Sequence, residues 1–153
     1  MNNYKFKAIN LIAETFEERN VKFEVITHLD SEQLLAGFSV DCGPNVMMRF
    51  ISLDNDNDVA IRIYSLISNT PADKRPRVLE ACNMINRKVR YMKFYVDIDG
   101  DINVEYDVPV KAPDIGIGEM AFEMFIRMMR TLDAEYHVLT KALYSDEALI
   151  FDA

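Results

Sequence analysis

The sequence predicts an α+β fold, a mostly antiparallel β-sheet packed with helices in the order α-β-β-β-β-α-β-β-α. Runs of alternating apolar and polar residues predict the strands, and apolar residues at helical spacing predict the helices. Short connections between consecutive strands favour antiparallel pairing. The chain has 153 residues, half of them hydrophobic, which suits a single domain over residues 1–153 with a substantial core.

The first helix is predicted at 3–19, where apolar residues recur on one face, and Asn20 is a suitable C-terminal cap. Four strands follow, at 22–27, 34–42, 46–53 and 59–66. A second helix is predicted at 71–89, a hairpin at 91–108, and a long final helix at 117–143. We expect residues 145–153 to form a loosely held tail.

The predicted hairpin turns at Asp99-Gly100, a strong turn signal between two alternating runs. A two-residue loop would oppose apolar to polar side chains along the whole ladder, so we predict a three-residue loop, 99–101. The expected pairs are Ile98 with Ile102, Val96 with Val104, Phe94 with Tyr106 and Lys93 with Asp107.

The stretch LEACNMINRKVRYMKFYVDIDGDINVEYDVPV resembles the YbjN-type family of small bacterial proteins. The matching features are two helical asparagines three apart, basic residues after them, an aromatic strand, an Asp-Gly turn and a second strand that ends near a proline. In this sequence they are Asn83, Asn86, Lys93-Phe94-Tyr95, Asp99-Gly100 and Pro109.

The resemblance implies a fold like that of type III secretion chaperones and a description as a sensory-transduction regulator. The family has no established catalytic residues, so it supplies none here. We interpret Asn83 and Asn86 as structural residues.

Composition argues against several classes of function. The net charge of −8 makes general binding to nucleic acid or to an anionic membrane unfavourable. Residues 1–20 alternate charged with apolar residues, so we predict neither a signal peptide nor a membrane span, and we place the protein in the cytoplasm. Cys42 and Cys82 form no CxxC pattern, and we expect both to be small buried hydrophobes.

No catalytic, metal or cofactor site is predicted, and we expect a protein that is not an enzyme. The loop 54–58 spaces its aspartates as a calcium loop does, but it lacks the glycine and the distal glutamate that such a loop requires. His28 and His137 fall in no zinc or nucleophile pattern.

Basic residues concentrate between positions 74 and 93. An anionic partner could use them, but we favour charge segregation that balances acidic surface elsewhere. The residues are Lys74, Arg75, Arg77, Arg87, Lys88, Arg90 and Lys93.

The predicted strands and the final helix carry more apolar side chains than a core on one face of the sheet requires. The strands 46–53 and 59–66 carry apolar residues on both faces, and we assign Met47, Ile51, Leu53, Tyr64 and Leu66 to the face opposite the core. The final helix is broadly apolar and rich in Met and Phe. These residues could form core, a homodimer interface or a client-binding surface.

A four-residue loop between these two strands would place Arg49 opposite Arg62. Like charges across strands are unfavourable, so we expect a carboxylate near them, from this chain, from a second copy or from a partner.

We therefore predict a non-catalytic cytoplasmic protein-binding module, a chaperone-like or regulatory adaptor that forms a homodimer and could hold a protein or peptide client. The alternative is a small-molecule-sensing regulator with its ligand between the last helix and the sheet, in a pocket lined by Met and Phe. The candidate interface residues are Met47, Arg49, Ile51, Arg62, Tyr64, Met124 and Met128.

Overall fold

The computed structural model describes residues 3–53, 58–109 and 116–150, and it confirms the predicted fold class and element order. The loop that resembles a calcium site lies outside the described residues except for Asp58. The elements in chain order are α1 (Lys7–Glu18), β1 (Glu24–Thr27), β2 (Ser31–Ser39), β3 (Asn45–Leu53), β4 (Asp58–Ile67), α2 (Arg75–Lys88), β5 (Lys93–Val96), β6 (Ile102–Pro109) and α3 (Ile117–Tyr144).

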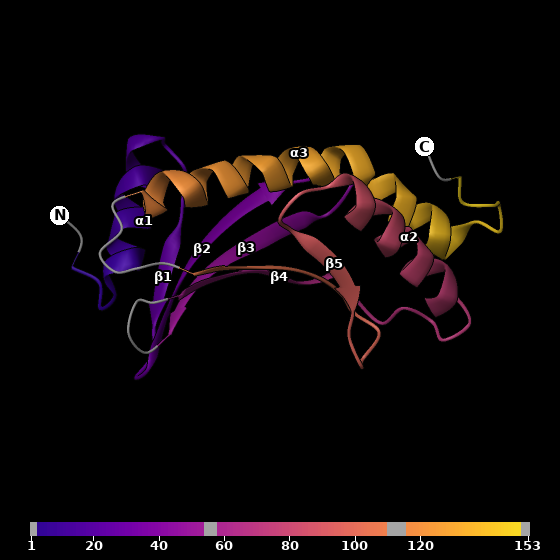
Figure 1. Cartoon of the computed structure of the whole chain (residues 1–153), viewed down its shortest axis with the longest axis horizontal. Coiled ribbons are helices and arrows are strands. Elements are labelled where there is room, and N and C mark those ends of the chain that lie inside the picture. Colours follow the sequence, from indigo (N-terminus) through magenta and orange to yellow (C-terminus); the bar gives the residue numbers. More distant parts are fainter. Residues whose placement is uncertain (1–2, 54–57, 110–115, 151–153) are drawn as a thin grey trace.

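The six strands form one sheet in the order β1-β2-β3-β4-β6-β5, and every neighbouring pair is antiparallel. Figure 1 shows α1 at one end of the arched sheet, α2 at the other end, and α3 running across the top between them. The three helices share one hydrophobic core with one face of the sheet. The architecture is therefore two layers, with the helical layer on a single side.

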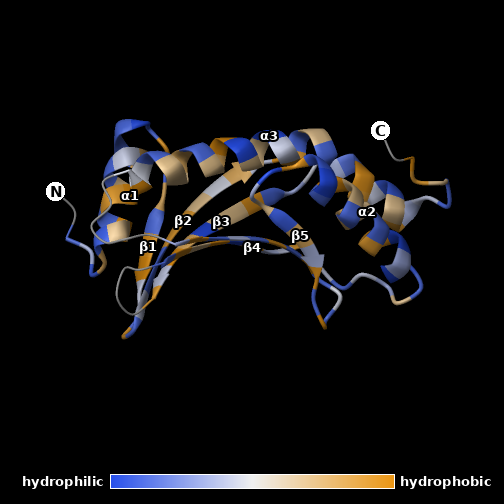
Figure 2. Cartoon of the chain, in the orientation of Figure 1, coloured by the Kyte–Doolittle hydropathy of each residue, from blue (hydrophilic) through white to orange (hydrophobic). Residues whose placement is uncertain are grey.

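The core is centred on aromatic contacts between the helices and the sheet. The ring of Phe16 on α1 lies 5.4 Å from that of Phe50 on β3 and 5.7 Å from that of Phe125 on α3. Phe125 also meets Phe38 of β2 edge to face, at 5.6 Å. Figure 2 shows hydrophobic positions recurring along α3 and along the strands, with hydrophilic positions between them, as the period of each element requires.

Both ends of α1 are stabilised by specific hydrogen bonds. The buried Glu32 carboxylate of β2 accepts the backbone N–H groups of Lys5 and Phe6, each at 3.0 Å, just before the helix begins. At the other end the predicted cap is confirmed, because Asn20 has a φ of 58° and the Val21 N–H donates to the Phe16 carbonyl at 2.8 Å.

Asn86 joins α2 to the edge strand β5. Its side-chain amide donates to the Phe94 carbonyl at 2.9 Å and accepts the Phe94 N–H at 2.8 Å, as a neighbouring strand would. Asn86 therefore has the structural role expected of it, whereas Asn83 is exposed on the same helix.

The predicted hairpin register is wrong by two residues. Val96 pairs with Ile102, Phe94 with Val104 and Lys93 with Glu105, so the loop covers residues 97–101 and Ile98 is exposed at its tip. The faces are unchanged, because a shift of two residues preserves the alternation. The side-chain pattern alone cannot distinguish these two registers.

Asp97 provides the physical reason for the longer loop. Its carboxylate accepts the backbone N–H groups of Asp99 and Asp101 at 2.9 and 3.0 Å, and the Asn103 side-chain amide at 2.8 Å. The Gly100 N–H also donates to the Asp97 carbonyl, and Gly100 has the positive φ of 84° that this turn needs. A strand extended through Ile98 would lose these bonds.

A bulge in β4 also corrects the prediction for Leu66. Ser65 has a φ of 51°, and the pairing with β6 shifts between Ile63 and Ile67. Leu66 consequently turns into the core instead of lying on the opposite face. The Asn103 and Asp101 side chains hold the bulge by accepting the Ser65 backbone N–H and hydroxyl.

The tail is held more firmly than predicted over residues 145–150. Asp146 pairs with Lys74 at 2.9 Å, the Glu147 carbonyl accepts the Arg77 guanidinium at 2.8 Å, and Leu149 packs against the core. These contacts connect the end of α3 to α2.

Helices α1 and α3 are in close contact at Gly118, where a side chain does not fit. A Cβ atom there would lie 2.1 Å from the Thr15 hydroxyl and 2.6 Å from the Leu11 carbonyl. The absence of a side chain at Gly118 therefore sets the separation of the two helices.

We expect Gly118→Ala to lower the free energy of unfolding by roughly 2 kcal/mol, because the helices must separate to admit the methyl group. The matched control is Gly37→Ala, whose Cβ would meet its nearest atom at 3.4 Å, an ordinary contact. Urea unfolding of both variants measures the difference. Equal destabilisation of the two would contradict the packing argument.

The Asp97 network predicts a pH-dependent loss of stability. The pKa of Asp97 lies below its ordinary value, chiefly because the Asp101 backbone N–H donates to the carboxylate, with the Asn103 amide next. A carboxyl group whose pKa is lower in the folded state stabilises the fold at pH values above its unfolded-state pKa. This stability is lost as the pH falls through the folded-state pKa.

We therefore expect Asp97→Ala to lower Tm at pH 7, and the difference from wild type to shrink below about pH 4. Asp99→Ala in the same turn is the control, because the Asp99 backbone N–H remains available to Asp97. A Tm difference for Asp97→Ala that is the same at pH 7 and in strong acid would contradict the assignment.

Candidate functional site

The sheet face that carries no helix of the described chain is the first candidate site, here called the outer face. Its side chains come from strand residues that alternate with the core residues. They include Glu24, Ile26, Gln33, Leu35, Met47, Arg49, Ile51, Leu53, Ala60, Arg62, Tyr64, Lys93, Glu105 and Asp107.

Large apolar side chains stand exposed on the outer face. Met47 on β3 is 43% exposed, Tyr64 on β4 50% and Leu53 53%. Leu35 and Ile51 lie on the same face but are buried, and neither belongs to the main core. The outer face therefore has a buried apolar floor with exposed apolar residues around it.

Arg49 and Arg62 lie directly opposite each other at the centre of this face, as predicted. Arg62 is neutralised within the chain by Asp107 at 2.6 Å and Glu105 at 3.8 Å, both on β6. Arg49 donates to the Gln33 side chain at 3.0 Å and lies 5.9 Å from the centre of the Tyr64 ring, without a carboxylate among the described residues. The carboxylate partner that was expected for this pair is therefore found for Arg62, and none of the described residues supplies one for Arg49.

Two of the predicted interface residues are core residues. Met124 is 5% exposed and Met128 is fully buried in the cluster that α3 forms with the sheet. The sequence of a broadly apolar helix does not show which side faces the core. In the structure, the side with Met124 and Met128 packs against the strands. Neither methionine is available to a partner of the folded chain.

The space between α3 and the sheet is filled by these side chains. Phe125, Met128 and Leu132 are buried there, and Phe125 contacts aromatic rings of both α1 and β2. The predicted Met- and Phe-lined ligand pocket would require displacement of core residues.

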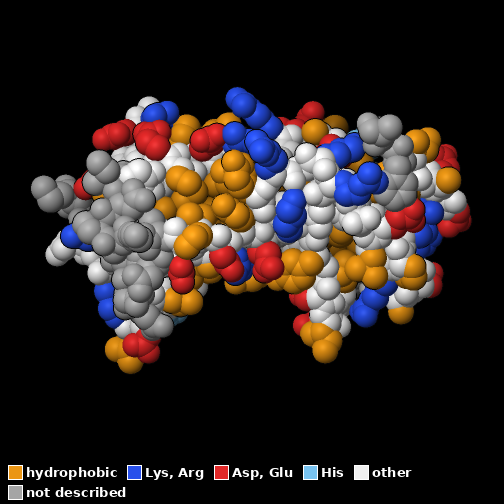
Figure 3. Space-filling view, in the orientation of Figure 1, with side chains coloured by type: hydrophobic (Ala, Val, Ile, Leu, Met, Phe, Trp, Pro, Cys, Tyr) orange, Lys and Arg blue, Asp and Glu red, His pale blue; other side chains and the backbone are white. Residues whose placement is uncertain are grey.

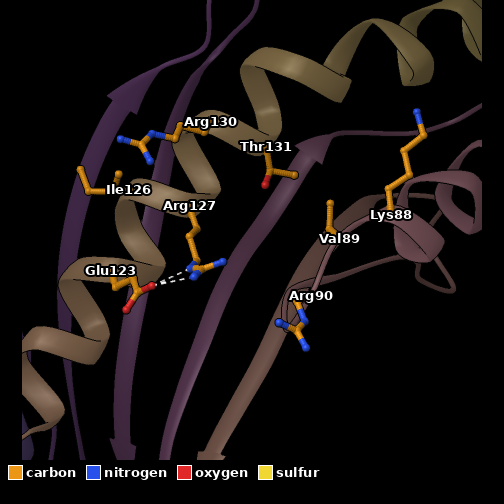
Figure 4. A pocket seen from close by; sticks show the side chains of 8 residues that line it. All are labelled: Lys88, Val89, Arg90, Glu123, Ile126, Arg127, Arg130 and Thr131. Carbon is orange, nitrogen blue, oxygen red and sulfur yellow. Dashed lines mark hydrogen bonds and ion pairs between the residues drawn. The ribbon is translucent and has the colours of Figure 1, made fainter.

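A second candidate site is a surface groove of about 510 Å³ between α3 and the link from α2 to β5, here called the basic groove. It combines the last residue of α2 and the first two residues of the link with one side of α3 (Figure 4). It is lined by Lys88, Val89, Arg90, Glu123, Ile126, Arg127, Arg130 and Thr131.

No local sequence pattern predicts this groove, because its cations come from two distant segments, 88–90 and 127–130. The predicted basic cluster 74–93 is largely used to hold the fold together. Arg77 donates to the Ala142 carbonyl at 3.1 Å near the end of α3, and Lys93 donates to the Asn86 and Val89 carbonyls at the end of α2. Lys74 pairs with the tail.

The cysteines and histidines form no site in the described chain. Cys42 is exposed, which corrects the prediction of burial, whereas Cys82 is buried and its burial raises the pKa of the thiol to about 11. Within residues 3–53, 58–109 and 116–150, no three His, Cys, Asp or Glu side chains gather as a metal site would require. Among these same residues, no helix has the length and apolar character needed to cross a membrane.

Comparison with known proteins identifies a family and a fold. The model of the YbjN family, described as "Putative bacterial sensory transduction regulator", matches residues 9–136. The crystal structure of YbjN from E. coli, described as "a putative transcription regulator", is similar with a TM-score of 0.50 and 12% identity, over 87% of this chain and 90% of that chain.

A weaker similarity is found to the Yersinia pestis type III secretion chaperone SycH, solved in complex with a stable fragment of YscM2. The TM-score is 0.41 at 12% identity, over 82% of this chain and 98% of that chain. No curated protein matches the chain.

The two central arginines should differ in their effect on stability. We expect Arg62→Gln to lower the free energy of unfolding by about 1 kcal/mol, because it removes partly exposed ion pairs. Arg49→Gln should change stability little, because it loses one neutral partner and relieves the repulsion from Arg62. Urea unfolding tests the order, and a larger loss for Arg49→Gln would contradict it.

Proposed function

The chain belongs to the YbjN family, and we propose that it is a non-catalytic cytoplasmic protein-binding module that self-associates through the outer face. One observation carries the proposal. Exposed apolar side chains surround an arginine that has no carboxylate partner among the described residues, on a sheet face without a described helix.

The composition of the outer face supports an interface. Exposed patches of large apolar residues on a protein surface commonly mark contacts with other proteins. Tyr, Met and Arg are enriched where proteins meet, and Tyr64, Met47 and Arg49 are neighbours on β3 and β4. The buried floor of Leu35 and Ile51 holds the strands that present them.

The charges on this face are complementary to those of a second copy. Arg49 lies on β3, whereas Glu105 and Asp107 lie on β6, with β4 between them. Adjacent strands are about 4.8 Å apart, so the arginine and the acids are about 10 Å apart. A two-fold axis near Arg62 would place Arg49 of each copy over the acidic strand of the other, as an isologous dimer requires.

The shape of the molecule leaves room for a partner on this side. In Figure 1 the strands bow toward α3, and the β5–β6 turn projects on the opposite side. Figure 3 shows that the edge of the molecule opposite α3 is hollow between two projecting parts of the surface. Ile98 is 92% exposed at the β5–β6 tip, where it could contact a second copy seated in the hollow.

The test is the solution mass by light scattering across a dilution series. We expect wild type to form a dimer and Tyr64→Glu to be monomeric at the same concentration, because a buried carboxylate would disrupt the interface. The matched control is Leu79→Glu on the exposed side of α2, where Leu79 is 54% exposed against 50% for Tyr64. The control should remain a dimer.

A monomeric wild type at every concentration would refute self-association. Dimers that survive Tyr64→Glu but not Leu79→Glu would place the interface on the helical layer instead. Circular dichroism of each variant confirms that the changes in mass do not come from unfolding.

A further inference from the structure

We infer that the basic groove is a binding site for a small phosphate-bearing molecule. The chain has a net charge of −8, yet four of the groove's lining residues are cations and one, Glu123, is an acid. Figure 3 shows Lys and Arg side chains gathered beside a hydrophobic patch on the face that carries α3 and β5. Such a local reversal of charge attracts an anion.

Two cations of the groove have no partner in the part of the chain that the structure describes. Within the described residues, neither the Arg90 nor the Arg130 side chain forms an ion pair or a hydrogen bond, although other Arg and Lys side chains of α2 and β5 cap helices or pair with acids. Lys88 lies 3.6 Å from Glu135 and is therefore partly neutralised. The partnerless arginines are free to bind a ligand.

Arg127 retains donors for a ligand although it is paired. Its Nε and Nη2 atoms both contact one oxygen of Glu123, at 2.8 and 2.7 Å, which fixes the guanidinium and leaves Nη1 available. The same guanidinium lies 5.6 Å from the centre of the Tyr91 ring. A planar guanidinium held in this way matches two oxygens of a phosphate group.

The backbone places Arg90 on the opposite wall. The Met92 N–H donates to the Arg90 carbonyl at 3.0 Å, and Tyr91 between them has a φ of 72°, so the chain reverses in a tight γ-turn. Figure 4 shows Arg90 on this link and Arg127 on α3, with Thr131 further along α3, while the Arg130 and Lys88 side chains point away from Arg90 and Arg127. The Thr131 hydroxyl supplies a further donor.

Size and lining favour a small molecule over a polypeptide. The volume of about 510 Å³ lies within the range typical of small-ligand sites. Val89 and Ile126 give the groove apolar surface beside its charges, which suits a phosphate attached to an organic group. The proposal is independent of self-association, since the groove uses no residue of the outer face.

The probes are inorganic pyrophosphate and ADP, titrated into the full chain in low-salt buffer by calorimetry. We expect saturable binding of one anion per chain, weakened about tenfold by Arg90→Gln and at least as much by Arg127→Gln, since each removes a charge-assisted hydrogen bond. Arg87→Gln is the matched control, because Arg87 is exposed near the end of α2, three residues before Arg90, but does not line the groove.

Tighter binding of ADP than of pyrophosphate would indicate that the apolar lining contacts the organic group of the ligand. Equal binding would indicate that the site recognises the phosphates alone. Either result supports the site. Absence of saturable binding for both probes would overturn it, as would an equal loss of affinity in Arg87→Gln. A hexaglutamate peptide that binds more tightly than both probes would also overturn it, in favour of an acidic polypeptide.

Discussion

The packing of α3 across one face of the sheet is the constraint on which the rest of the structure depends. Its 28 residues extend over about 42 Å at 1.5 Å per residue, from α1 to α2. Gly118 fixes one end against Thr15 of α1, and Arg77 of α2 binds the carbonyl groups near the other end. Because both ends are fixed, Phe125, Met128 and Leu132 are directed into the sheet between them.

A helical layer on a single side leaves the sheet with two different faces. On the outer face, β2 and β3 carry the large apolar side chains of Leu35, Met47, Ile51 and Leu53, whereas ion pairs join β4 to β6 through Arg62. This division makes the face neither a second core nor an ordinary solvated surface. It combines exposed apolar area with a fixed pattern of charge, and these are the properties that give an interface affinity and orientation.

The sequence was sufficient for the elements and their faces, because periods of 2 and 3.6 residues determine both. It was insufficient where two arrangements preserve the same period. The hairpin register depends on hydrogen bonds of Asp97, and the burial of Leu66 depends on a bulge held by Asn103. Similarly, Met124 and Met128 lie on a helix that is apolar over more than one side, so only the tertiary contacts decide which residues are buried.

The distribution of cations shows why sequence density is a poor guide to an anion site. The basic residues between positions 74 and 93 lie near helix ends, and carbonyl groups left unpaired at those ends are favourable partners for Arg and Lys. Most of this cluster therefore stabilises the fold, and only Lys88 and Arg90 of it line the basic groove. Arg127 and Arg130, more than thirty positions further along the chain, meet Arg90 only after α3 has packed. A cation that the fold leaves without a partner, in a hollow beside other cations, is the stronger indication of a ligand, because its charge is not already compensated within the chain.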